Sequence, residues 1–418
     1  MAKPSIVILG GYGNTGRALA RMLLEHTDAS LVVCGRSGEK ADRQATILNE
    51  RHPGRRVRGV AADAADRASL LHAFSDADLV VAASSTSALT RNVAETALEA
   101  GLDYLDPQYS TRKLDVLRAM APRIEAAGRC FITEAGFHPG LPAVLVRFAA
   151  CRIENLRRAR VGSVIQLDWT RLEFSPSTID EMVAEFRDFQ SLTFKNGGWQ
   201  PMSWVESFRP TWMTFSHAFG RRYTMPMFME EMRALPDMIP GLEETGFFVG
   251  GFNWFVDWIV MPLGMAMARI SPRAGSQAFG RMLMWGLRGF TRPPYGTLLR
   301  LEANGLHQGK EVELQLTVYH ADGYVLTVAP IVACLLQVLD GTARRAGLHY
   351  QAHVVDPERM LGDMRRMGVE IEVDGPASDQ ETCVQWDAIR SVPAPKNPPP
   401  GDCPLAPSVV TFNPFHGG

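Results

Sequence analysis

The chain has 418 residues, of which 46% are hydrophobic and 21% are charged, so it can bury a large core and is not disordered for most of its length. Its formal net charge of −2 excludes the basic surface that nucleic-acid-binding proteins carry. The six cysteines are scattered without C-x-x-C spacing, which is typical of free thiols in a reducing compartment rather than of a disulfide or zinc framework.

The first 140 residues alternate short apolar runs with segments of helical periodicity, the pattern of a doubly wound parallel sheet. The first apolar run ends in glycines, which indicates a strand rather than a signal peptide, and we expect a cytoplasmic protein. The predicted strands are Ser5–Leu9, Leu31–Cys34, Arg58–Ala62, Leu79–Ala83, Tyr104–Leu105 and Cys130–Thr133. The predicted helices are Arg17–Glu25, Ala68–Phe74, Asn92–Ala100 and Lys113–Ala127. We therefore assign residues 1–140 to a Rossmann-type dinucleotide-binding domain of the α/β class.

A glycine-rich turn connects the first predicted strand to the first helix. It comprises Gly10, Gly11, Tyr12, Gly13, Asn14, Thr15 and Gly16, and its last six residues fit G-x-G-x-x-G. The glycines permit a tight turn and close approach of the backbone to a pyrophosphate, while the helix N-terminus attracts the phosphates. Because the motif follows a strand and opens a helix, it predicts a dinucleotide site, with a ligand-free turn as the alternative.

The end of the second strand selects between the nicotinamide cofactors. NAD-binding domains carry an acidic residue there for the ribose 2′-hydroxyl, whereas this sequence has Arg36 and Ser37. A guanidinium matches a 2′-phosphate, so we predict NADP(H). NAD stays an alternative cofactor, because the nearby Glu39 carboxylate suits a ribose 2′-hydroxyl. The alternative interpretation of Arg36 is a solvated surface residue.

Further cofactor contacts are predicted where the third and fourth strands end, because open α/β sheets bind ligands at that edge. Asp63 accepts a hydrogen bond either from the adenine amino group or from a helix N-terminus that it caps. The residues Ser84, Ser85 and Thr86 are expected to face the cofactor, with helix capping as the alternative. The nicotinamide is expected to face residues 84–86, 106–109 and 134–138.

Two residues are candidates for proton transfer. His138 follows the sixth strand, and we expect Pro139 to lie in the first turn of the next helix, whose positive end keeps the imidazole neutral. A helix cap without a catalytic task is the alternative for His138. Tyr109 and Lys113 have the Y-x-x-x-K spacing of short-chain dehydrogenases, a minor alternative because the pair follows the fifth strand too closely. No metal site is predicted, since the ten histidines are dispersed.

Six segments of the chain together resemble a known family. They read IVILGGYGNTGRALA, VVCGRS, YLDPQYS, FITEAGFHPGLPAVLVR, YHADGYVLTVAPIVACLLQVLDG and VDPERMLGDMRRMGVEIE. These segments, within about residues 1–150 and 310–372, resemble the saccharopine dehydrogenase and reductase family, more narrowly its bacterial NADP-binding members of uncertain substrate. The resemblance implies a two-domain NADP-dependent oxidoreductase acting on imines or related bonds, or on the C=C bond of lipid-like substrates. His138 stands where the family usually has Asp, which argues against an amino-acid substrate.

Residues 141–325 are predicted to form an α+β substrate and dimerisation domain on a mixed or antiparallel sheet. The predicted strands are Val161–Thr170, Thr297–Ala303 and Glu311–His320. An apolar insertion occupies 200–290, and within it Phe247–Met267 carries a single charge. Three interpretations of this segment stay open: a buried or dimer-forming helix pair, a membrane-surface lid, and a transmembrane helix. Its methionines and aromatic residues favour a pocket for an apolar, lipid-like substrate.

The C-terminal part is expected to return to the nucleotide domain over 326–373. Residues 374–418 hold nine of the chain's 27 prolines and are predicted to form an extended tail. The sequence thus predicts an NADP(H)-dependent oxidoreductase that transfers a hydride to or from a C=N, C=O or C=C bond of a hydrophobic small molecule. We expect a homodimer, with peripheral membrane contact through 247–267. A non-catalytic NADP-binding redox sensor or membrane-peripheral scaffold is the alternative.

Overall fold

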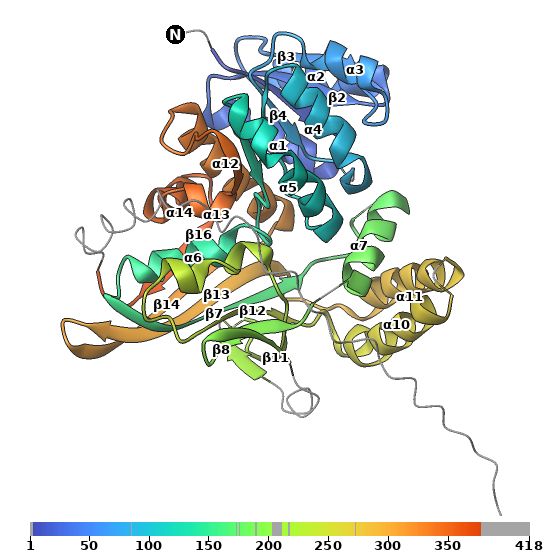
Figure 1. The fold of residues 1–418 in the computed structure, drawn as a ribbon. Helices are drawn as coiled ribbons and strands as arrows, with labels where there is room; N and C mark the ends of the chain where they lie inside the picture. Colours follow the sequence, from blue (N-terminus) through green and yellow to red (C-terminus); the bar gives the residue numbers. More distant parts are fainter. Residues whose placement is uncertain are drawn as a thin grey trace, which may run out of the picture.

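A computed structural model describes residues 3–84, 86–172, 174, 176–188, 190–202, 211–215, 218–271 and 273–377. The chain forms two sheets, one parallel and one mixed, with helices packed around and between them (Figure 1). Ser85 and most of the predicted tail lie outside the described residues.

The first sheet is the predicted Rossmann sheet. Its seven strands are all parallel, in the order β15-β6-β5-β4-β1-β2-β3. The strands are β1 (Ser5–Leu9), β2 (Ser30–Gly35), β3 (Val57–Ala61), β4 (Leu79–Ala82), β5 (Asp103–Leu105), β6 (Cys130–Thr133) and β15 (Gly347–Tyr350). The helices between them are α1 (Asn14–His26), α2 (Gly38–Arg51), α3 (Arg67–Phe74), the 3-10 turn η1 (Ser87–Leu89), α4 (Thr90–Glu99) and α5 (Thr111–Ala126). The α/β fold class is confirmed.

Helix α2 is the element of this domain that the sequence pattern did not predict. Its buried residues are only Ala41, Ala45 and Leu48, so two of the three are too small to produce an apolar stripe. The helix packs on β2 and β3 through backbone proximity instead, and a side chain at Gly59 would collide with Ala41 and Asp42.

The second sheet is mixed, as predicted. Its main path is β10-β11-β12-β7-β13-β14-β16, in which β12 and β7 are parallel and the other neighbours antiparallel. These strands are β7 (Asn155–Gln166), β10 (Thr211–Thr214), β11 (Arg221–Pro226), β12 (Glu244–Gly250), β13 (Gly296–His307), β14 (Lys310–His320) and β16 (Glu370–Asp374). Off this path, β8 (Leu192–Lys195) pairs with β12, and β9 (Gly198–Pro201) pairs with β8. The associated helices are α7 (Pro176–Asp188), η2 (Glu230–Met232), α9 (Leu235–Met238), the π-helix η3 (Val256–Val260), α10 (Met261–Ile270) and α11 (Ala274–Phe290).

The apolar segment Phe247–Met267 is not one continuous helix, so the transmembrane-helix interpretation is wrong, while a membrane-surface lid and a buried or dimer-forming helix pair stay predictions for the helical part. Residues Phe247–Gly250 form the end of β12, which lies inside the sheet between β7 and β11. Helical structure starts only after Asn253, whose Oδ1 accepts the Val256 N–H at 3.0 Å. This side-chain cap ends the strand pattern and opens the helix. In the described part of the chain, no helix has both the length and the apolar character needed to cross a membrane.

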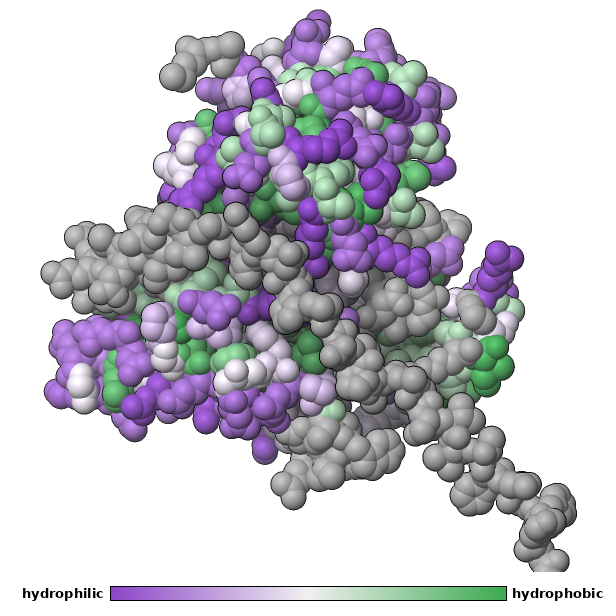
Figure 2. Space-filling model, in the orientation of Figure 1, coloured by the Kyte–Doolittle hydropathy of each residue, from purple (hydrophilic) through white to green (hydrophobic). Residues whose placement is uncertain are grey.

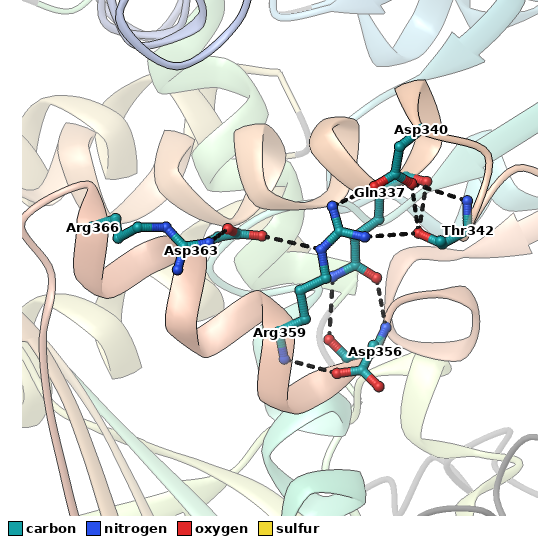
Figure 3. A network of polar contacts seen from close by, with 7 residues as sticks. All are labelled: Gln337, Asp340, Thr342, Asp356, Arg359, Asp363 and Arg366. Atoms are coloured by element: carbon teal, nitrogen blue, oxygen red, sulfur yellow. Dashed lines mark hydrogen bonds and ion pairs between the residues drawn. The ribbon is translucent and has the colours of Figure 1, made fainter.

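The C-terminal segment contributes to both sheets. Helix α12 (Gly323–Leu339) packs against α1, and β15 adds to β6 of the first sheet, whereas β16 pairs with β14 of the second. Figure 3 shows the polar contacts between α12 and α14 (Pro357–Arg366). The Gln337 side-chain amide accepts the Asp356 N–H at 2.7 Å and donates to the Asp356 carbonyl at 3.2 Å. Arg359 forms an ion pair with Asp340 at 2.5 Å.

Helix α6 (Leu141–Ala150) lies at the junction of the two domains, and all ten of its residues are buried. One hydrophobic cluster contains residues of the first sheet, of α6 and of the second sheet, for example Ile8, Val144 and Leu301. The guanidinium of Arg147 is buried within it and donates to the carbonyls of Ala352 and Val355, the latter at 2.9 Å. The C-terminal return is thereby held against α6.

We expect Arg147→Met to lower the free energy of unfolding by about 2–3 kcal/mol, because two buried carbonyls lose their donor while the apolar stem is kept. Arg21→Met, the same change at an exposed position of α1, serves as the control and should stay within about 0.5 kcal/mol of wild type. Urea titration measures both. Unchanged stability of Arg147→Met would mean that burying the guanidinium costs as much as its hydrogen bonds stabilise.

Candidate functional site

The glycine-rich turn forms a cradle at the N-terminus of α1. Gly10 has φ +85°, and a Cβ there would lie 2.5 Å from the Cβ of Ser84. A Cβ at Gly16 would collide with the Gly10 carbonyl oxygen, so helix and turn approach more closely than any side chain permits. Gly13 is the N-cap and supplies no side-chain hydrogen bond to the helix. The first N–H groups of α1 are therefore oriented for a pyrophosphate, and the cradle fits the predicted dinucleotide.

The residues predicted to bind the adenosine half lie beside this turn. The ring of Tyr12 covers Gly35, and its hydroxyl accepts the Ser37 N–H at 3.0 Å. Arg36 is exposed and forms no ion pair with a carboxylate of the described residues, so its guanidinium is available for a 2′-phosphate. Ser37 also caps α2, because its Oγ accepts the Lys40 N–H.

Asp63 has a local role in the structure. Its Oδ1 accepts the Ala65 N–H at 2.9 Å and closes the turn after β3. The residue that caps α3 is Asp66, three positions later. An adenine contact from Asp63 stays a prediction.

The ends of β4 and β5 meet where the strand order reverses between β4 and β1, the position at which open α/β sheets bind ligands. Ser84 Oγ and Thr86 Oγ1 lie 3.3 Å apart, and the Gln108 amide nitrogen donates to the Ser84 carbonyl. Gln108 Oε1 is buried and has no hydrogen-bond partner among the described residues. An unsatisfied amide oxygen at this point suits a ligand donor such as a carboxamide N–H.

The C-terminal return reaches the same turn from the other side. The Asn14 amide donates to the Tyr324 hydroxyl at 3.0 Å, and Tyr324 lies in the first turn of α12, which Asp322 caps. Sequence reasoning did not single out Tyr324, because it is 310 residues from Asn14 and no local pattern marks it.

Lys113 and Asp106 form a fully buried ion pair at 2.5 Å. Asp106 also accepts from the Thr133 hydroxyl at 3.0 Å, and Lys113 donates to the Gln108 carbonyl. Tyr109 precedes α5, whose N-cap is Ser110, so Tyr109 and Lys113 do not lie one turn apart on a helix as a Y-x-x-x-K pair does. The lysine compensates the charge of Asp106, so the helical Y-x-x-x-K arrangement is absent, and a proton-transfer role for Tyr109 stays a prediction.

Glu134 directly follows β6 and is fully buried in the left-handed backbone region at φ +52°. Neither carboxyl oxygen has a hydrogen-bond partner among the described residues. Burial raises the pKa of Glu134 from 4.5 to about 7, partly offset by the charge of Lys113. Burial also raises the pKa of Glu231, which comes from the second domain and accepts the Ala143 N–H at 3.4 Å. The domain junction thus holds two carboxyl groups that favour the protonated state.

His138 lies beside this cluster, in the turn between β6 and α6. The helix begins at Leu141 and has Pro142 in its first turn, so the expectation that Pro139 starts the helix is wrong: the His138–Pro139 peptide is cis and belongs to the turn. The imidazole packs against Phe137 and Phe247, with ring centroids 4.5 and 5.6 Å away. Burial lowers the pKa of His138 to about 4, so the ring is neutral at pH 7 because of desolvation rather than a helix terminus. Nε2 is buried without a hydrogen-bond partner among the described residues.

Comparison with known proteins identifies the first domain. Residues 6–132 match the family model of the saccharopine dehydrogenase NADP binding domain. Over these residues the chain is similar to the NADP binding domain of saccharopine dehydrogenases. The match confirms the resemblance seen in the sequence and NADP(H) as the cofactor, and it supports an NADP-dependent oxidoreductase.

Nine-tenths of the chain shares its fold with a solved saccharopine dehydrogenase. The apo saccharopine dehydrogenase (L-Glu forming) from Saccharomyces cerevisiae superposes with a TM-score of 0.62 at 15% identity, over 90% of this chain and 100% of that one. A dehydrogenase from Chromobacterium violaceum gives a TM-score of 0.42 at 12% identity, over 88% of this chain and 94% of that one. A highly reducing polyketide synthase from Aspergillus terreus is 33% identical over 70 residues, which is 17% of this chain and only 3% of the synthase.

We expect NADPH to bind the NADP binding domain at least tenfold more tightly than NADH, because Arg36 replaces the acidic residue that NAD needs. Arg36→Ala should remove most of that difference, since one charge-assisted contact accounts for about tenfold. Arg51→Ala, at an exposed position of α2, is the control and should leave the ratio unchanged. Titration of protein fluorescence with both cofactors measures the ratio, and equal affinities in the wild type would contradict the role of Arg36.

The raised pKa of Glu134 also predicts how stability depends on pH. Because the folded-state pKa of about 7 exceeds the ordinary 4.5, the favourable contribution is complete below pH 4.5 and is lost as the pH rises through 7. Relative to wild type, Glu134→Gln should therefore gain about 1–3 kcal/mol of unfolding free energy between pH 5 and pH 8. Glu125→Gln, at an exposed site, should show a constant difference. A constant difference for Glu134→Gln as well would show that its carboxyl is not desolvated.

Proposed function

We propose that this protein is an NADP(H)-dependent oxidoreductase that transfers a hydride to or from a C=N, C=O or C=C bond of a hydrophobic small molecule. The observation that carries the proposal is the pair of unpartnered groups after β6, the Glu134 carboxyl and His138 Nε2. They follow a strand at the carboxyl edge of the sheet, the edge that holds the cofactor in open α/β domains. The bound cofactor supplies the hydride, and the protein must orient the substrate and exchange a proton.

Glu134 is the group best suited to exchange that proton. A pKa of about 7 leaves the carboxyl close to half protonated at neutral pH, the condition under which general acid–base catalysis is most effective. Asp106, the other acid close to this end of the sheet, is compensated by Lys113 and Thr133. Glu134 has no such partners, so its carboxyl can gain or lose a proton near pH 7 at a small cost in free energy.

His138 is suited to position the substrate rather than to donate a proton as a cation. With a pKa of about 4, fewer than about one imidazole in a hundred is protonated at pH 7. The neutral ring offers Nε2 as an acceptor for a hydroxyl or amine, or in the other tautomer as a donor to a carbonyl. The phenyl rings of Phe137 and Phe247 beside it favour an apolar substrate over a charged amino acid.

The proposal is tested by following NADPH consumption with apolar imines, ketones and enoyl compounds. We expect turnover with one of these classes, and His138→Ala should lower kcat by about 10²-fold or more while the Kd for NADPH changes little. Glu134→Gln should lower kcat and remove the ionisation near pH 7 from the pH profile of kcat. Tyr109→Phe is the control, expected within about threefold of wild type.

Two outcomes would contradict these assignments. If the kcat of His138→Ala lies within about threefold of wild type, the histidine only packs in the turn. If Tyr109→Phe loses activity, Tyr109 is the proton source. NADPH binding without turnover on any of the three substrate classes would contradict an enzyme and favour a cofactor-binding sensor.

A further inference from the structure

The exposed large hydrophobic side chains of this protein are concentrated on one lobe. Among the described residues they are Trp212, Met225, Trp254, Trp258, Ile259, Leu263, Ile270 and Trp285. Six of the eight belong to the helical hairpin of residues 254–290, which comprises η3, α10 and α11, and the other two lie on β10 and β11. Figure 1 shows this hairpin at one end of the second domain, away from the nucleotide domain, and Figure 2 shows hydrophobic residues at the surface of that lobe.

The aromatic members form one connected surface. Phe290 contacts both Trp254 and Trp285, with ring centroids 5.7 and 5.6 Å apart, although these tryptophans come from different arms of the hairpin. Trp258 stacks on Tyr223 at 5.7 Å, which extends the surface to β11. Trp254, Trp258 and Trp285 remain 60–66% exposed despite these contacts. A contiguous exposed aromatic patch of this kind marks a site of contact with another protein or with a membrane.

The same hairpin is strongly basic: it contains four arginines, and its single acidic residue is Asp257, whose carboxylate accepts the Phe252 N–H at 3.0 Å. Between Asp257 and Glu302 the sequence contains six arginines and no acidic residue, whereas the chain average of 45 acidic residues in 418 would place about five in a stretch of this length. Arg273, Arg281, Arg288 and Arg292 are all exposed, and none forms an ion pair with a carboxylate in the part of the chain that the structure describes. Arg281 and Arg288 lie four and three residues from Trp285, so they share its face of α11.

We propose that this hairpin docks on the surface of an anionic lipid bilayer, with Trp254, Trp258 and Trp285 inserted at the headgroup level and the arginines facing the phosphates. Exposed tryptophans flanked by arginines are the composition of interfacial membrane-binding helices. The hairpin does not span the bilayer, because α10 and α11 have 10 and 17 residues and a span needs about 20 apolar ones.

A second copy of the chain is the other occupant that an apolar face of this kind suggests, and the charge pattern argues against it. A twofold interface brings the same patch of both copies together, so arginines would approach arginines, while the one carboxylate of the hairpin, Asp257, is bonded to the Phe252 N–H. An anionic bilayer supplies negative charge to the exposed arginines that lie beside the tryptophans, Arg281 and Arg288.

Co-sedimentation of the full-length protein with vesicles tests the proposal. We expect binding to vesicles of phosphatidylcholine with 30–40% phosphatidylglycerol, weak binding to phosphatidylcholine alone, and a decrease as salt concentration rises. Trp254→Ser/Trp258→Ser should lower the partition coefficient by about tenfold or more, and Arg281→Glu/Arg288→Glu should do the same for anionic vesicles. Arg43→Glu/Arg51→Glu on α2 is the matched control and should bind like wild type.

NADPH affinity of each variant, expected to equal that of wild type, shows that the nucleotide domain remains folded and is independent of the proposed enzymatic activity. The proposal is overturned if anionic vesicles do not bind the wild-type protein, or if neutral vesicles bind it equally well. It is also overturned if the wild-type protein is a dimer that Trp254→Ser/Trp258→Ser converts to a monomer, because the patch is then an interface between copies.

Discussion

The burial of helix α6 is the constraint on which the two-domain arrangement depends. A helix with no exposed residue needs partners for its end groups and for any charge it carries, since water cannot supply them. Its N-terminus receives the Glu231 carboxyl from the second domain, and its Arg147 holds the carbonyls of the C-terminal return. The three parts of the chain are therefore joined at one helix, and separating any of them would leave buried polar groups without a partner.

The acidic groups at this junction differ in how well they are compensated. Asp106 has a lysine and a hydroxyl, whereas Glu134, one strand further along the sheet, has neither. Uncompensated burial destabilises the charged carboxylate and brings its pKa to the range in which it can give and take a proton. The buried carboxyl thus carries a local cost in stability at the place where the proposed reaction exchanges a proton, a trade that functional sites commonly show.

Strand β12 connects this site with the exposed lobe. Phe247 packs on the ring of His138, and seven residues later the chain reaches Trp254 at the start of the basic, aromatic hairpin. The apolar segment Phe247–Met267 therefore has one end in the candidate site, at Phe247, and continues into the exposed hairpin, which starts at Trp254.

The sequence by itself determined the elements whose signal is local. The glycine-rich turn, Arg36 after β2 and the strands of the first sheet follow from backbone geometry and short-range periodicity, which neighbouring residues specify. Only the tertiary structure decided the elements without a local signal. Phe247–Gly250 is a strand because β7 and β11 flank it. Helix α2 has almost no apolar stripe because it packs mainly through alanines. Tyr324 and Glu231 reach the site from 310 and 88 residues beyond their partners Asn14 and Ala143. The pKa of Glu134 is raised to about 7 because the fold buries its carboxyl without a hydrogen-bond partner among the described residues. Burial and long-range pairing are properties of the packed chain, so no local pattern encodes them.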